Sequence, residues 1–354
     1  MDRPKTSAAP ARPGAAERSR TLQGIALVIF AYSLVGASFT ANSLLGDYPY
    51  AGGQALRYGL AFLLLLPLLG GRAALAPVRA LTSRQWVRIG LVAGIGMVGF
   101  NLAVLAAERT AEPAVPGVFV GCAPVIVAVL VPLMNDRRPT RPVLYGALAV
   151  AAGAFAVQGW GRTDTMGVVW SVAALIGEVG FAVLAVPVLR PLGPRLLTAC
   201  VCALATVESV LVGLVVDGAD LVRMPTGTET LALLWQAAVV TVVGFVLWYM
   251  GVQRIGAERA TLFTGMIPVA AALTAPLVGA GAFGPAQAVG GLLVAAGAVL
   301  GSGVFDARKT PERNHTAEKV HRTKKVHKAG EARHSEQAEQ SRAAPDGAVP
   351  DDRR

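Results

Sequence analysis

The pentapeptide Val-Ala-Ala-Gly-Ala occurs twice in this chain, at residues 150–154 and again 144 positions later at residues 294–298. Five further pairs share that spacing: Gly121, Pro124, Pro132, Gly146 and Leu148 match Gly265, Pro268, Pro276, Gly290 and Leu292. Upstream of them the spacing is 145, where Gly99, Phe100 and Arg109 match Gly244, Phe245 and Arg254. The chain therefore contains a duplicated unit, and a duplicated hydrophobic unit is typical of secondary transporters.

The chain is too apolar for a water-soluble globule, because 54% of its residues are hydrophobic, only 15% are charged and the mean hydropathy is +0.54. A helix needs about 20 mostly apolar residues to cross the hydrocarbon of a bilayer. Ten runs of about that length predict an all-α polytopic membrane protein. The runs are residues 24–44, 53–69, 87–107, 115–134, 142–160, 167–188, 196–216, 231–252, 260–278 and 286–304.

Five of these runs precede Met166 and five follow it. Because five is odd, the second copy of the unit must enter the membrane from the opposite side. The sequence thus predicts ten transmembrane helices arranged as two inverted five-helix repeats, over residues 22–160 and 165–305.

Loop charges test this arrangement, since Lys and Arg favour cytoplasmic loops. Basic residues concentrate in the N-terminal tail and the even-numbered connections, whereas the odd-numbered connections offer only Arg109, Arg162 and Arg223. We therefore expect a multi-pass protein of the plasma membrane with both termini cytoplasmic. Residues 1–21 and the basic segment 306–354 have too few large apolar residues to fold, and we expect two disordered tails. The C-terminal tail could attract anionic membrane lipids.

The block 98–157 and its partner 243–301 resemble the EamA family of the drug/metabolite transporter superfamily. The motifs that carry the resemblance are the five-plus-five duplication, a Gly-x-x-Pro in each half (Gly121 to Pro124, Gly265 to Pro268) and a Gly-rich last helix. Arg57 matches an arginine that such proteins often carry in the second helix. The resemblance implies ten helices around a central cavity that moves polar metabolites or drugs, often outward.

Glu178 and Glu208 are the acidic residues nearest the centres of predicted helices, where a charge costs about 2.5 to 3.5 kcal/mol. A carboxyl group in hydrocarbon is held protonated and can release its proton when a cavity hydrates, which is the chemistry of a proton-coupled carrier. The alternative is that either carboxyl only links helices. Arg57 could meet an anionic group of the substrate or one of the two glutamates, or it could extend to the interface as an anchor.

Four further polar or aromatic residues are candidate walls of a substrate site or links between helices: Asn42, Asn101, Trp248 and Tyr249. Pro124 and Pro268 remove a backbone donor at matching positions, so they predict two kinked helices beside a site near the middle of the membrane.

We expect a secondary transporter that exports a small polar metabolite or drug by alternating access, coupled to protons, with no cofactor and no metal. The chain lacks a Gly-x-x-x-x-Gly-Lys-Ser/Thr loop, so ATP drive is unsupported. Nucleic acid is not an expected partner, because no aromatic-interleaved basic domain carries the net charge of +10. A membrane enzyme acting on a lipid-like substrate and a non-transporting scaffold remain as alternatives. Whether the protein is a monomer or a homodimer stays open.

Overall fold

The computed structural model describes residues 15–42, 44–45, 48–71, 75–111, 114–159, 162–278 and 284–302. These residues belong to one compact unit that spans residues 14–306. The described part is helical, and its only extended contact is an isolated bridge between Ala111 and Thr163.

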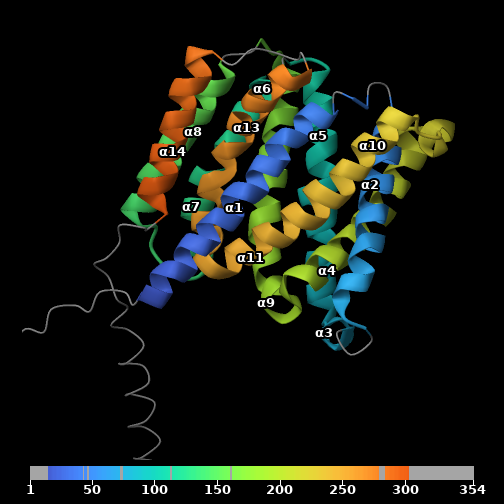
Figure 1. Cartoon of the computed structure of the whole chain (residues 1–354), viewed down its shortest axis with the longest axis horizontal. Coiled ribbons are helices and arrows are strands. Elements are labelled where there is room, and N and C mark those ends of the chain that lie inside the picture. The colour runs from blue at the N-terminus through green and yellow to red at the C-terminus, as the bar shows by residue number, and fades with distance from the viewer. Residues whose placement is uncertain are drawn as a thin grey trace, which may run out of the picture. The chain divides into compact units, whose positions relative to one another are not determined.

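The first half of the described chain contains the following elements (Figure 1): α1 (Ala15–Asn42), α2 (Tyr50–Leu65), η1 (Leu66–Leu69), α3 (Ala76–Arg79), α4 (Ser83–Ala93), η3 (Gly94–Gly99), α5 (Phe100–Glu108), α6 (Ala114–Gly121), α7 (Ala123–Met134) and α8 (Arg141–Gln158). Helix α1 begins at Ala15, within the predicted tail 1–21. Glu17 lies in its first turn, where a carboxylate favours the positive end of the helix dipole. The rest of the predicted tails, residues 1–14 and 306–354, lies outside the described residues.

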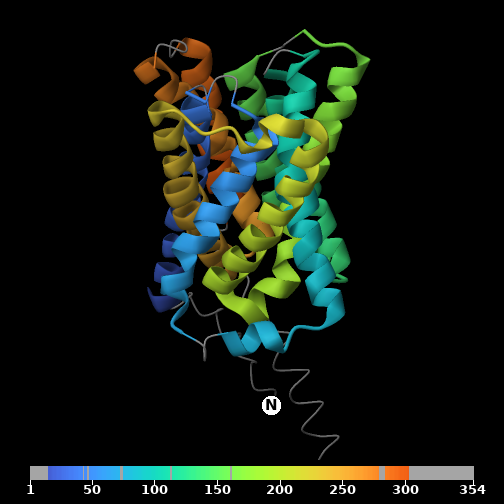
Figure 2. The same cartoon turned by 90° about the vertical axis from the view of Figure 1, so that its right-hand side faces the viewer.

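The second half contains α9 (Thr165–Val216), η4 (Gly218–Val222), α10 (Gly227–Trp235), η5 (Gln236–Gly244), α11 (Phe245–Ile255), α12 (Ala257–Ala260), η6 (Thr261–Gly265), α13 (Met266–Thr274), η7 (Ala275–Val278) and α14 (Pro285–Gly301). Helix α9 is two helices in one run of 52 residues, because Gly193 adopts a non-helical backbone with φ 71° and ψ 170°. The part of α9 that follows this break packs along α2 (Figure 2), where a Cβ on Gly59 would lie 3.3 Å from the Thr206 methyl group.

By length and composition, seven helices of the described chain could cross a membrane. The number is below the predicted ten because of where the elements begin and end. Helix α9 counts once although it contains both predicted runs 167–188 and 196–216, on either side of Gly193. The run 260–278 is divided among α12, η6, α13 and η7, and α14 is only 17 residues long. Large apolar side chains also remain exposed along these helices, such as Leu63 at 59% and Leu292 at 72%. A multi-pass membrane protein accounts for such surfaces, which water would disfavour.

Two π-helices occur at matching positions of the duplication. In η3 the π-helix ends at Gly99, and in η5 it ends at Gly244, the glycine that matches Gly99 in the sequence. Each is followed at once by a phenylalanine, Phe100 or Phe245. Because π-helices are rare and are frequently found at functional sites, a matched pair indicates that the two halves share a local backbone design.

Helices α8 and α14, which carry the repeated pentapeptide, pack side by side (Figure 1). A Cβ on Gly146 would lie 2.6 Å from the carbonyl oxygen of Gly297, and a Cβ on Gly297 would lie 2.7 Å from that of Gly146. Neither position has room for a larger side chain, so glycine is what lets the two backbones touch. The contact is reciprocal and antiparallel.

Both predicted proline kinks coincide with breaks in helical geometry. Helices α6 and α7 are separated at Cys122, two residues before Pro124. The 3-10 helix η6 ends at Gly265, three residues before Pro268. Each proline lacks the N–H that would bond the carbonyl four residues earlier, so regular helix is disfavoured at these points.

Candidate substrate cavity

A cavity of about 670 Å³ lies among helices from both halves of the chain. Its walls include polar and aromatic side chains from seven elements: Tyr32 and Ser38 of α1, Arg57 and Tyr58 of α2, Phe100 and Asn101 of α5, Gln158 of α8, Glu178 and Phe181 of α9, Phe245 and Trp248 of α11, and Thr264 of η6. A cavity of this volume is in the range that small-molecule sites occupy.

The cavity lies nearer one end of the helices. It is lined by the C-terminal half of α1, the first half of α2, most of α5 and α6, and Gln158 in the last turn of α8. These stretches point toward the end at which Tyr48 precedes α2 and at which Ala111 and Thr163 form their bridge. No lining residue comes from α4, α7 or α12, which lie toward the other end.

Glu178 presents a carboxyl group to this cavity from the middle of the part of α9 that precedes Gly193. Its side chain is partly exposed, and it forms no hydrogen bond or ion pair with any described residue. Tyr32 of α1 lies close enough to interact with it electrostatically. A carboxyl group without a protein partner at this depth is free to bind a proton or a ligand.

Arg57 reaches the cavity from α2 and is only 8% exposed. Its Nε donates a hydrogen bond of 2.8 Å to the Thr241 hydroxyl, and that hydroxyl donates to the Gln236 carbonyl oxygen within the π-helix η5. Neither Glu178 nor Glu208 pairs with Arg57. The predicted pairing of Arg57 with a glutamate is therefore not formed in this structure, and its contact with an anionic substrate group or extension to the interface stays a prediction.

Tyr58 and Asn101 adjoin Arg57 in the cavity wall. The Arg57 guanidinium carbon lies 5.3 Å from the centre of the Tyr58 ring. The Asn101 amide nitrogen donates to the Met97 carbonyl oxygen at 2.7 Å and to the Tyr58 hydroxyl at 3.3 Å. Because a carbonyl only accepts, the Met97 bond fixes which amide atom is the nitrogen. Tyr58 is therefore an acceptor toward Asn101 and keeps its own proton to donate.

An aromatic wall faces the same space. Phe181 packs against Phe245 with ring centres 5.3 Å apart and against Trp248 with ring centres 5.0 Å apart. Trp248 in turn meets Tyr249 at 5.2 Å in an edge-on arrangement. The Trp248 indole N–H and the Thr264 hydroxyl are buried and make no hydrogen bond of good geometry within the described chain. The wall thus offers flat apolar surface with polar groups at its edge.

The remaining predicted site residues lie elsewhere. Tyr249 is fully buried behind Trp248, and Pro124 is buried in α7. Glu208 does not line the cavity; it lies beside the start of η3, where a Cβ on Gly94 would be 3.3 Å from its Oε2. Asn42 is the last residue of α1, and its side chain is outside the described part of the structure.

Sequence reasoning missed several wall residues, including Tyr32, Tyr58 and Phe181. An aromatic residue in an apolar helix carries no signal that separates a cavity wall from packed core. The duplication holds one usable signal, because Phe100 and Phe245, which match in the two halves, both line the cavity.

At the end away from the cavity, the two halves are joined by an ion pair. Arg137, just after α7, donates from Nη2 to Glu258 Oε1 of α12 at 3.0 Å. Burial raises the pKa of the Glu258 carboxyl, although the positive charges of Arg137 and Arg259 act in the opposite direction. The Glu258 side chain is 17% exposed and that of Arg137 is 63% exposed.

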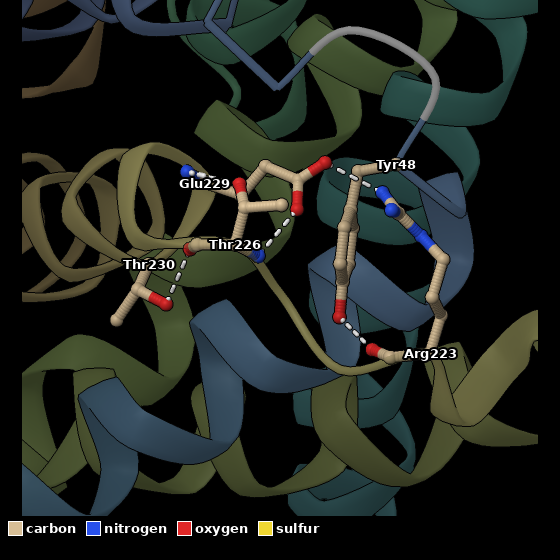
Figure 3. Close-up of polar contacts among 5 residues, drawn as sticks. All are labelled: Tyr48, Arg223, Thr226, Glu229 and Thr230. Carbon is tan, nitrogen blue, oxygen red and sulfur yellow. Dashed lines mark hydrogen bonds and ion pairs between the residues drawn. The ribbon is translucent and has the colours of Figure 1, made fainter.

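At the cavity end, a polar cluster joins the start of α2 to the start of α10 (Figure 3). Arg223 lies over the Tyr48 ring, 4.6 Å from its centre, and pairs with Glu229 at 2.6 Å. The Tyr48 hydroxyl donates to the Arg223 carbonyl oxygen at 2.7 Å. Thr226 and Glu229 also form a capping box at the start of α10. Nearby, the Gly52 N–H donates to Asp217 at 2.7 Å, so this end of α2 is held at two points.

Asp164 caps the start of α9 at the same end, where its carboxylate accepts a hydrogen bond of 2.8 Å from the Gly167 N–H. That hydrogen bond, followed by one from the Thr110 side chain, holds the pKa of Asp164 below its ordinary value. No group of three or more His, Cys, Asp or Glu side chains in the described ranges is placed to hold a metal ion.

Sequence comparison finds similarity between this chain and transporters. Residues 165–303 match the model of the EamA-like transporter family. A protein of Bacillus subtilis strain 168, the uncharacterized transporter YetK, is 24% identical over 260 residues, which cover 70% of this chain and 77% of YetK. The uncharacterized transporter YyaM of the same strain is 23% identical over 291 residues, covering 79% of this chain and 94% of YyaM.

A protein of known crystal structure shares the fold, with a TM-score of 0.65 at 20% sequence identity. The match covers 82% of this chain and 99% of that protein.

Proposed function

Because the chain belongs to the EamA-like transporter family, we propose that it is a secondary transporter that exports a small polar metabolite or drug across the plasma membrane by alternating access. The observation that carries the proposal is the cavity itself. It is built from both halves of the duplication, and it holds the Glu178 carboxyl group, which forms no hydrogen bond or ion pair within the part of the chain that the structure describes. A packed core would have no reason to keep either feature.

We assign ten membrane spans to the chain, in two inverted repeats. The reciprocal contact of α8 with α14 supports this assignment, because Gly146 meets Gly297 while Gly153 meets Gly290, so each glycine meets the other's repeat partner. An antiparallel pair related by a two-fold axis in the membrane plane produces this pattern. The matched π-helices η3 and η5 support it from another part of the fold.

The proline breaks fit the same symmetry. Pro124 and Pro268 would free the carbonyl groups of the residues four positions earlier, Val120 and Thr264. Val120 and Thr264 match in the duplication, and both line the cavity. Carbonyl groups freed inside a membrane need partners, and a hydrated cavity or a bound solute supplies them.

We propose that the structure is outward-facing. The cavity reaches toward the end that carries the odd-numbered connections, which are poor in Lys and Arg and therefore expected outside the cell. The Arg137–Glu258 ion pair closes the cytoplasmic end between the two halves in this state. Export then requires the pair to open while the outer end closes.

Glu178 is the residue to which we assign proton coupling. It is the cavity carboxyl, whereas Glu208 lies outside the cavity beside Gly90 and Gly94. A protonated Glu178 is neutral and tolerates a dry, closed site, and a deprotonated one is stabilised when water enters. The substrate and the proton can therefore both bind in the cavity that Glu178 lines, which is how binding of one can affect binding of the other.

Flux into liposomes tests the proposal, with purified parent protein, Glu178→Gln and Glu208→Gln compared with and without a proton gradient. We expect the gradient to accelerate solute flux by the parent and by Glu208→Gln, while Glu178→Gln should respond to a solute gradient alone. Gradient-insensitive flux by both the parent and Glu178→Gln would rule out proton coupling. No flux of any polar solute by the parent would contradict the transporter assignment.

A further inference from the structure

We propose that the solute carried by this protein bears a carboxylate, and that Arg57 and Tyr58 form its binding site. The inference rests on the proposed transport function and adds to it the chemical class of the substrate. The first observation is the positive charge of Arg57, because an arginine side chain stays protonated in proteins and this one lies in the cavity wall.

This cation lacks an anionic partner. Within the described chain, Arg57 forms no ion pair, and its one hydrogen bond is made by Nε to the neutral Thr241 hydroxyl. The whole residue is only 8% exposed, so Arg57 is largely removed from solvent. A buried charge without a counter-charge is costly, and a ligand that supplies the anion relieves that cost.

The hydrogen bond to Thr241 also fixes the orientation of the Arg57 guanidinium group. By holding Nε toward the π-helix η5, it leaves the terminal nitrogens as the donors that remain. Two terminal nitrogens in one plane match the two oxygens of a carboxylate, which is why arginine is favoured for such anions.

Tyr58 supplies a further donor. Its hydroxyl accepts from Asn101, so its proton is directed to another acceptor. The Tyr58 ring lies beside the Arg57 guanidinium, 5.3 Å from ring centre to guanidinium carbon, and both residues line the cavity. Both the Arg57 terminal nitrogens and the Tyr58 hydroxyl can donate hydrogen bonds to an anion placed beside them.

The rest of the ligand is defined by the aromatic wall. Phe181, Phe245 and Trp248 face the cavity with their rings in mutual contact. They favour a flat apolar group over a highly hydrated one. The site therefore fits a small organic acid with an apolar body, of a size that about 670 Å³ accommodates.

The charge preference of the site can be tested with three probes of similar shape: the anion 3-phenylpropanoate, the neutral 3-phenylpropanamide and the cation 3-phenylpropylamine. Binding to the purified full-length protein is measured by titration calorimetry. We expect the parent to bind the carboxylate at least about tenfold more tightly than the amide, because charge-assisted hydrogen bonds discriminate by at least that factor. Equal affinity for the three probes, or a preference for the amine, would overturn the inference.

Variants locate the site. Arg57→Gln should weaken carboxylate binding at least about tenfold and leave amide binding unchanged, which also shows that the variant is folded. Tyr58→Phe should weaken carboxylate binding several-fold by the loss of one donor. Arg190→Gln, the same change at an exposed arginine outside the cavity, should bind all three probes as the parent does. Undiminished carboxylate binding by both Arg57→Gln and Tyr58→Phe would refute the assignment.

Counterflow of the same probes in liposomes separates this inference from the proposed function. Arg57-dependent binding without flux of any probe would uphold the carboxylate site and contradict transport. Flux of the amine or amide in preference to the carboxylate would uphold transport and contradict the site.

Discussion

Gly153 of α8 and Gly290 of α14 occupy the same contact from opposite sides: a Cβ on Gly153 would lie 2.8 Å from the Gly290 carbonyl oxygen, and a Cβ on Gly290 would lie 2.7 Å from that of Gly153. Each added Cβ would meet a backbone carbonyl oxygen, which cannot move aside as the end of a flexible side chain can. The two helices must therefore separate if either residue gains a methyl group.

Gly153→Ala should lower the stability of the protein in detergent by about 1 to 3 kcal/mol, the usual effect of overpacking. Gly290→Ala should do the same, and the double variant should lose less than the sum, because both changes force one separation. Gly291→Ala is the matched control, since its Cβ would lie an ordinary 3.6 Å from Val269. Additive losses, or equal losses at Gly291, would show that this contact does not hold the helices together.

The hydrogen bond from Arg57 to Thr241 ties α2 to the π-helix η5. Thr241→Val keeps the shape and removes the acceptor, so we expect a loss of roughly 0.5 to 2 kcal/mol, as for other hydrogen bonds between membrane helices. Thr230→Val removes an exposed hydroxyl that bonds within its own helix, and its effect should stay within about 0.5 kcal/mol. Thermal unfolding in detergent measures both, and equal effects would contradict a special role for the Arg57 bond.

The cluster of Tyr48, Arg223 and Glu229 in Figure 3 is partly solvent-exposed, so its contribution should be modest. Arg223→Gln removes an ion pair and a cation–π contact together, and we expect a loss of about 1 kcal/mol. Glu229→Gln keeps an acceptor for the capping box and should lose less than Arg223→Gln. The reverse order, measured by thermal unfolding, would mean that the cap rather than the Arg223 contacts holds this end.

The hydrogen bonds of Asp164 at the start of α9 predict that the thermal stability of the protein depends on pH. Because hydrogen bonds hold the pKa of Asp164 below its ordinary value in the folded protein, its carboxylate stabilises the fold above the unfolded pKa. That stabilisation is lost as the pH falls through the folded pKa. Between about pH 6 and pH 3, the thermal midpoint of the parent should therefore fall further than that of Asp164→Asn, which cannot titrate. Identical pH profiles would show that the cap does not contribute.

The sequence predicted much of the fold because hydrophobic length and repeat spacing are properties of the chain itself. The run 115–134 corresponds to α6 and α7, and the run 142–160 corresponds to α8, with ends that differ by one or two residues. The π-helices η3 and η5 were not predicted, because no residue pattern distinguishes them from α-helix. The break in α9 was predicted, because Gly193 lies between the runs 167–188 and 196–216, but the residue that makes it was not identified, since a positive φ depends on the turn and not on composition.

The site was predicted only in part. Glu178, Arg57, Asn101, Trp248 and Pro268 line the cavity. Glu208 resembles Glu178 in the sequence, but it lies beside Gly90 and Gly94 and does not line the cavity. Which face of an apolar helix meets a cavity depends on tertiary packing, and a helix that is apolar all round carries no record of it.

The central claim is that the two halves cross the membrane in opposite directions. Arg109 and Arg254 match in the duplication, so they should lie on opposite sides of the membrane. Single cysteines at these positions, in a protein with Cys122, Cys200 and Cys202 replaced by alanine, can be labelled in intact cells with a membrane-impermeant maleimide. We expect Arg109→Cys to be labelled from outside and Arg254→Cys only after permeabilisation. Labelling of both from the same side would contradict the account.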